Sequence, residues 1–120
     1  MRRRLQSFVD AGRGVWQVFR TQANARIHAG AVVAVVALGL WLRIDGGEWA
    51  LLVLSMTGVL AAEAINTAVE YLVDLVSPEH RQLAGWAKDA AAGAVLLAAI
   101  GAAVVGGLVL GPRLLSAFSA

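Results

Sequence analysis

The chain has 120 residues, of which 59% are hydrophobic and 15% are charged, and its mean hydropathy is +0.72. An ordinary soluble domain is about 45–50% apolar, so this chain carries more apolar surface than one soluble core of its length can bury. The composition therefore predicts a single domain whose solvent is lipid. The lack of cysteine excludes disulfides and thiolate metal sites, and a net charge of only +2 argues against nucleic acid as the main partner.

Residues 4–27 are predicted to form an amphipathic helix that lies in the membrane interface. Their apolar side chains, which include Phe8 and Trp16, fall within about a third of the helical wheel at roughly 100° per residue. Arg13 and Arg20 lie on the other side of the wheel. Aromatic residues on the apolar face and arginine opposite them are typical of interfacial helices. A soluble helix that packs on a partner protein is the alternative, and it is less favoured because membrane spans follow at once.

Three apolar segments follow, and each is predicted to be a transmembrane helix. They cover residues 28–44, 48–76 and 90–111, and a tight turn at 45–47 joins the first two. The second segment would be roughly 43 Å long as a helix, against a hydrocarbon core of roughly 30 Å. We therefore expect its last turns, and the polar connection at 77–89, to reach the cytosol.

The positive charges predict how the chain crosses the membrane. Eight of the ten lysine and arginine residues lie in the segments 1–27 and 77–89, and the other two are Arg43 and Arg113. Cytoplasmic segments carry the excess of positive charge in membrane proteins. This distribution predicts a cytoplasmic N-terminus and 77–89 loop, with the C-terminus on the opposite side.

The inner part of the second span carries a stripe of polar side chains. Glu63, Asn66, Thr67, Glu70 and Asp74 share a sector about 100° wide on a helix. Ionisable side chains inside a membrane cost free energy and are usually functional. A buried carboxylate such as Glu63 is suited to accept a proton, whereas Glu70, closer to water, can hold Mg²⁺ through oxygen. Asn66 between them can orient a hydroxyl or a phosphate oxygen.

Each of these polar residues also has a simpler interpretation. The stripe can be a seam between helices in which the polar groups merely pair with one another. Lys88 is a usual phosphate partner but also a usual anchor at the cytoplasmic face. His28 and Trp86 fit interface anchors, and the loop residues at 79–81 fit a solvated surface.

The stretch EAINTAVEYLVD, residues 63–74, resembles the signature of the prokaryotic diacylglycerol kinase/undecaprenol kinase family of small integral-membrane lipid kinases. The likeness continues through SPEHRQLAGWAKDAAAGAVL at 77–96, and NARIH at 24–28 is similar to the undecaprenol kinase branch. The resemblance implies an all-α membrane protein with an N-terminal surface helix and three transmembrane helices, one domain over residues 1–120. It also implies a homotrimer, with active sites between subunits at the cytoplasmic face of the bacterial cytoplasmic (inner) membrane.

The resemblance further implies roles for individual residues in an ATP- and Mg²⁺-dependent phosphorylation of a lipid alcohol. Glu63 would be the proton acceptor, with Asn66 beside it, and Glu70 would bind Mg²⁺. The implied nucleotide-binding positions are Arg3, Asp10, Gln22, Glu70, Glu79, His80, Arg81, Lys88 and Asp89. The implied lipid-binding positions are Ser7, Phe8, Asn24, Arg26, His28 and Glu63.

Two positions depart from the family pattern. Gln22 stands where the family usually carries a second metal-binding glutamate, and its amide can give Mg²⁺ one oxygen but no charge. Asp10 stands where family members often have tyrosine near the nucleotide. It either supplies the missing charge or is a solvated surface acid.

Two other function classes compete with the kinase. A small ion or proton-coupled transporter also places carboxylates in membrane helices, but here the acids gather at the cytosolic leaflet rather than at the midplane. An inactive membrane scaffold is the second, and Gln22 gives it some weight. We predict an ATP-dependent lipid kinase whose substrate is undecaprenol or diacylglycerol.

Overall fold

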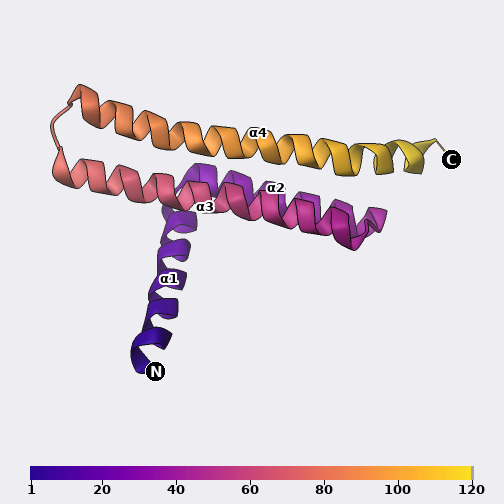
Figure 1. Ribbon diagram of the computed structural model, residues 1–120, viewed down its shortest axis with the longest axis horizontal. Coiled ribbons are helices and arrows are strands. Elements are labelled where there is room, and N and C mark those ends of the chain that lie inside the picture. Colours follow the sequence, from indigo (N-terminus) through magenta and orange to yellow (C-terminus); the bar gives the residue numbers. More distant parts are fainter. Residues whose placement is uncertain (120) are drawn as a thin grey trace.

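The computed structural model describes residues 1–119, which fold into four α-helices. Helix α1 spans Arg2–Thr21, α2 spans Ala23–Leu42, α3 spans Gly46–Val76 and α4 spans Gln82–Phe118. Helices α2, α3 and α4 lie side by side with alternating direction, and α1 stands across them (Figure 1). In this part of the chain, α2, α3 and α4 are each long and apolar enough to cross a membrane. The predicted all-α architecture, an amphipathic helix followed by three candidate spans, is confirmed.

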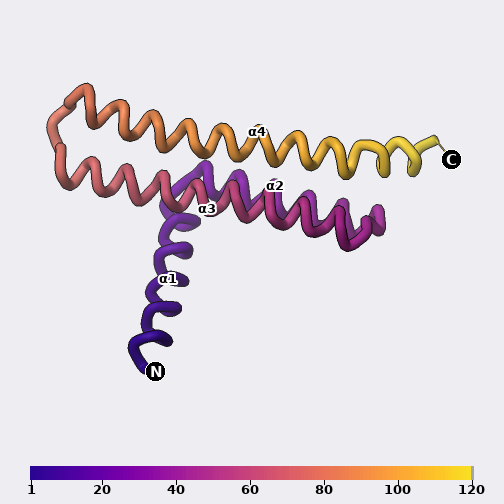
Figure 2. Tube along the Cα trace, in the orientation of Figure 1, coloured from indigo at the N-terminus to yellow at the C-terminus, as the bar shows by residue number. Residues whose placement is uncertain are grey.

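The boundary between α1 and α2 lies at Gln22, whose backbone is extended with φ -106° and ψ 115°. The prediction of one continuous helix over 4–27 is therefore wrong at its C-terminal end, because residues 23–27 belong to α2. The guanidinium of Arg26 donates to the carbonyl of Arg20 at 2.9 Å, so it satisfies a carbonyl that the end of α1 leaves free. This one extended residue lets α1 leave the direction of α2 (Figure 2).

Helix α4 begins earlier than predicted. Its first residue is Gln82, so the connection from α3 is shorter than the predicted loop of 77–89. Lys88 and Asp89 therefore lie on a helix rather than in a loop. The end of α3 and the start of α4 run past the place where α1 crosses, so the connection between them lies beyond α1 (Figure 1).

Helix α4 also ends later than predicted, because it continues through Pro112 to Phe118. Proline removes one backbone donor from a helix interior and usually interrupts it. Here the next residue, Arg113, donates to the carboxylate of Glu48 and lies 3.5 Å from that of Asp45. These contacts tie the last turns of α4 to the start of α3.

The turn between α2 and α3 is closely packed. Asp45 caps α3 by accepting the backbone N–H of Glu48 at 2.8 Å. The ring of Trp49 lies against Gly39 so closely that a Cβ on this glycine would be 2.7 Å from it. A cluster of buried apolar side chains at this end comprises Ile44, Leu52, Val109 and Leu110. This end of the bundle is therefore fixed by contacts within the chain itself.

Elsewhere on α2, α3 and α4, many large apolar side chains face outward. Leu54, Leu97 and Leu108 are each more than two-thirds exposed. Contiguous apolar surface of this extent is not left in water by a stable protein. Lipid or other subunits therefore cover these helices, as expected of membrane spans.

Candidate active site

Glu63 lies where α1, α2 and α3 meet. Its side chain is buried, with 3% of the residue exposed, and its Oε1 lies 3.4 Å from the Nε2 of His28 on α2. The hydroxyl of Thr67, one turn later, donates to the Glu63 backbone carbonyl at 2.9 Å and is also buried. The hydroxyl of Thr67 thus bonds to the helix backbone rather than to the carboxylate of Glu63.

Asn66 and Glu70 form the next part of the stripe. The Nδ2 of Asn66 donates to Glu70 Oε1 at 3.4 Å, and this contact holds both side chains on the same face of α3. The Oδ1 of Asn66 is buried and has no hydrogen-bond partner among residues 1–119. Buried polar atoms are almost always satisfied, so this oxygen fits a donor or a cation that a ligand would bring.

These oxygens fit Mg²⁺. The ion prefers hard oxygen ligands and is usually held by one or two carboxylates together with substrate phosphates. Residues 1–119 contain no group of three or more acidic, histidine or cysteine side chains that would enclose a metal by themselves. The carboxylate of Glu70 and the buried oxygen of Asn66 are two oxygens of the type that Mg²⁺ binds.

Gln22 lies at the junction of α1 and α2. The preceding residue, Thr21, places its hydroxyl 3.2 Å from the hydroxyl of Tyr71, which directly follows Glu70 in the chain. The end of α1 is thus anchored to α3 next to the proposed metal ligand. Helical spacing alone does not single out Thr21 or Tyr71, although Tyr71 stands inside the signature stretch.

Lys88 on α4 pairs with Asp74 on α3, since its Nζ donates to Asp74 Oδ1. Asp74 was recognised as part of the stripe, but its partner was not predicted. A prediction of a short connection between α3 and α4 would have indicated this pair. Residues equally far from a short connection lie opposite each other on two antiparallel helices. The pair places the ammonium group of Lys88, which is 40% exposed, at the open end of the stripe. Asp89 follows it and is exposed.

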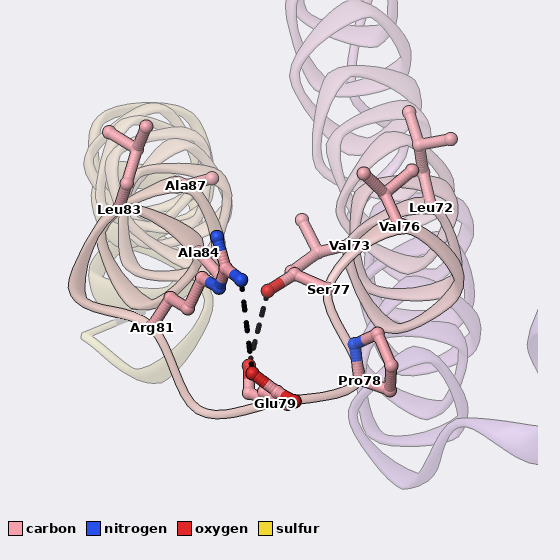
Figure 3. A pocket seen from close by; sticks show the side chains of 10 residues that line it. All are labelled: Leu72, Val73, Val76, Ser77, Pro78, Glu79, Arg81, Leu83, Ala84 and Ala87. Atoms are coloured by element: carbon pink, nitrogen blue, oxygen red, sulfur yellow. Dashed lines mark hydrogen bonds and ion pairs between the residues drawn. The ribbon is translucent and has the colours of Figure 1, made fainter.

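Two grooves lie at the connection between α3 and α4. The larger, of about 600 Å³, is lined by the last turns of α3 and the first turns of α4, and Arg81 and Ser77 both reach Glu79 there (Figure 3). The Arg81–Glu79 contact is 3.8 Å, and the Ser77 hydroxyl donates to the Glu79 carbonyl at 3.1 Å. The smaller groove, of about 160 Å³, is lined by polar residues that include Asp74, His80, Arg81 and Lys88. Most of the residues predicted to bind nucleotide near α4 therefore gather in one place.

The predicted site residues on α1 do not join this group within one chain. Ser7, Phe8 and Asp10 are exposed on the part of α1 that leads away from the bundle (Figure 1), as is Arg3. Asp10 instead accepts from Gln6 at 3.0 Å and lies 3.6 Å from Arg13, as a solvated surface acid does.

Three of the residues predicted to bind lipid lie in the first turns of α2, after the junction with α1. Asn24 is exposed, Arg26 is engaged with the end of α1, and His28 points to Glu63. Of these three residues, His28 is the one in contact with the stripe.

Comparison with known proteins finds relatives that match most of this chain. Residues 10–110 match the prokaryotic diacylglycerol kinase family. Undecaprenol kinase of Bacillus subtilis (strain 168) is 41% identical over 114 residues, which cover 95% of this chain and 93% of that protein. Diacylglycerol kinase of Synechocystis sp. is 48% identical over 113 residues, which cover 93% of this chain and 65% of that protein. Diacylglycerol kinase of Escherichia coli (strain K12) is 34% identical over 92 residues, or 77% of this chain and 75% of that protein.

The match covers the signature stretch of α3, the connection after it and most of α4. It agrees with the three apolar helices and with the polar stripe at the end of α3. This chain therefore belongs to the prokaryotic diacylglycerol kinase family and is a multi-pass membrane lipid kinase.

Proposed function

We propose that this protein transfers the γ-phosphoryl group of Mg²⁺-bound ATP to the hydroxyl of a membrane lipid alcohol. The observation that supports this proposal most is the order in which polar side chains follow one another along α3. A buried carboxylate at Glu63 is followed by the oxygens of Asn66 and Glu70, and then by the Lys88–Asp74 pair beside the grooves. An alcohol held in lipid and a nucleotide from water can meet along such a line.

In the proposed reaction, the lipid hydroxyl attacks the γ-phosphorus while Glu63 takes its proton. The new bond joins the lipid oxygen to phosphorus, the bond to the β-phosphate oxygen breaks, and ADP leaves with its electron pair. Bound Mg²⁺, held by Glu70 and Asn66 Oδ1, would supply neutralisation of phosphate charge. Lys88 adds positive charge at the open end, and Asp74 fixes its position. Phosphoryl transfer depends mainly on such positioning and electrostatics.

We take undecaprenol as the first substrate to test and diacylglycerol as the second. The undecaprenol kinase relative aligns over almost its entire length, and the NARIH segment at 24–28 is similar to that branch. Both relatives named after diacylglycerol align over smaller shares of their own length.

We further propose a homotrimer in the bacterial inner membrane, with the α3–α4 connection in the cytoplasm. The positive charges of α1 and of the connection support this orientation. The exposed apolar faces of α2, α3 and α4 support further subunits. A neighbouring chain would also bring Arg3, Ser7, Phe8 and Asp10 to a site from which they are distant in their own chain.

The test is a direct assay of lipid phosphorylation. Purified protein in vesicles receives γ-labelled ATP, Mg²⁺ and either undecaprenol or diacylglycerol, and the label in extracted lipid is measured. We expect label in the polyprenol fraction. Label in diacylglycerol alone would show that diacylglycerol, and not undecaprenol, is the substrate. Nucleotide binding without label in either lipid would favour the inactive scaffold.

A further inference from the structure

His28 and Glu63 form a contact that the proposed reaction does not yet use. The two residues are 35 positions apart in sequence, yet His28 Nε2 lies 3.4 Å from Glu63 Oε1. The side chain of Glu63 is 4% exposed, and that of His28 is 26% exposed. Polar groups at this depth in a membrane helix rarely meet without function.

Apolar cavities lie on both sides of this pair. His28 lines a cavity of about 390 Å³ between α2, α3 and α4, together with Val32, Leu52 and small residues of α4. Glu63 lines a second cavity, of about 150 Å³, with Val15, Val18 and Phe19 of α1. The pair therefore separates two spaces that hydrocarbon can occupy.

The other charged groups nearby are already engaged. Arg26, on the same helix as His28, donates to the carbonyls of Arg20 and Phe19 on α1. Glu70, further along α3, accepts from Asn66. The α4 residues that line the cavity with His28 are alanine, glycine and leucine, and His28 and Glu63 are the only titratable side chains among the residues that line these two cavities.

We infer that His28 is a positioning residue for the proton acceptor, an inference that rests on the proposed role of Glu63. The imidazole holds Oε1 of the carboxylate and leaves Oε2 free to accept the proton of the lipid hydroxyl. The imidazole also gives the buried carboxylate a polar partner in apolar surroundings. Without this neighbour, no contact with His28 would fix the orientation of the carboxylate.

Kinetics of the variants His28→Ala, His28→Gln and Val32→Ala test the inference. Val32 is a matched control, because it lines the same cavity one turn along α2 without a polar group. We expect His28→Ala to lower kcat by about 10- to 100-fold, with KM for the lipid little changed. His28→Gln keeps a donor and should recover much of the kcat. Equal losses of kcat in His28→Ala and Val32→Ala, with no recovery in His28→Gln, would show that His28 acts only in packing.

A spectroscopic measurement keeps this inference separate from the proposed function. The ¹⁵N spectrum of the His28 ring should show Nε2 carrying a hydrogen-bonded proton in the wild-type protein, and this signature should be lost in Glu63→Leu. His80, which is exposed in the α3–α4 connection, serves as an internal reference whose spectrum should not change. Identical His28 spectra in both proteins would show that His28 does not contact Glu63, even if the wild-type enzyme phosphorylates lipid. A paired His28 in a protein that does not turn over lipid would instead refute the proposed function and the role of His28 in it.

Discussion

The two ends of the α3–α4 hairpin are built on opposite principles. At the α2–α3 turn, apolar side chains form a buried cluster, Asp45 caps a helix, and Arg113 pairs with Glu48. At the α3–α4 connection, the polar groups line open grooves. The first end therefore packs apolar side chains tightly, although Glu48 Oε2 there is buried without a hydrogen-bond partner in the described part of the chain, whereas the second end presents charged groups to open grooves. The first end thus holds the helices together, and the second is the end at which we propose that the chemistry takes place.

The largest effect should come from Glu63→Gln. The amide keeps the size of the side chain but cannot accept the proton, so kcat should fall by about 10²- to 10⁴-fold. Assembly and thermal unfolding should change little, because the amide can still contact His28. Label transfer to lipid and size-exclusion chromatography measure both. Near-normal kcat would remove Glu63 as the proton acceptor.

Glu70→Gln should sharpen the assignment of the metal site. Loss of the carboxylate should raise the Mg²⁺ concentration needed for half-maximal activity by about 10- to 100-fold. Gln22→Glu is the matched variant, because it adds a charge where the family usually has one, and it should leave activity equal or higher. An unchanged Mg²⁺ titration in Glu70→Gln would contradict its role as a ligand. A clear loss in Gln22→Glu would show that Gln22 belongs to a different arrangement.

Gly39→Ala tests the packed end. The added Cβ would lie 2.7 Å from the ring of Trp49, so the ring must move. We expect a loss of about 1–3 kcal/mol in stability, as for other overpacked positions. The Mg²⁺ requirement should not change, since the site is at the other end. Gly30→Ala is the control, because a Cβ there meets nothing within 4 Å. Equal unfolding temperatures for the two variants would count against tight packing at this turn.

The smallest effect is expected from Asp45→Asn, which should change how Tm depends on pH. The backbone N–H of Glu48, with Arg113 nearby, holds the pKa of Asp45 below its usual value of 3.8. Its folded pKa is lowered, so its contribution to stability is present above the unfolded value and is lost as pH falls through the folded value. Asp45→Asn should therefore lower Tm slightly near pH 6 and flatten its decline below pH 4. A parallel decline in both proteins would contradict the shift.

Local periodicity explains which parts of this site were predictable. The stripe on α3 follows from the helical spacing of residues 63–74, which depends on no distant contact. The break at Gln22 was missed because no glycine or proline marks it. The start of α4 was missed because Pro78 and Gly85 favoured a loop, yet Gly85 donates its N–H to the Arg81 carbonyl at 3.0 Å and continues the helix.

Contacts between helices were the least predictable. The His28–Glu63 and Lys88–Asp74 pairs join helices, and their geometry depends on how α2, α3 and α4 pack. A sequence shows that such groups are present at the right depth, but it does not show which ones meet. In the proposed trimer, the positions on α1 would likewise depend on contacts with another chain, which the sequence does not show.

Paramagnetic relaxation by Mn²⁺-ATP tests the functional assignment of the two ends most directly. Manganese can replace magnesium at oxygen ligands and broadens the amide signals of nearby residues. If nucleotide binds at the α3–α4 connection, signals from residues 66–89 should broaden, while those from residues 39–52 and 105–113 stay sharp. Broadening at the α2–α3 turn, or none along the end of α3, would contradict the placement of the kinase site.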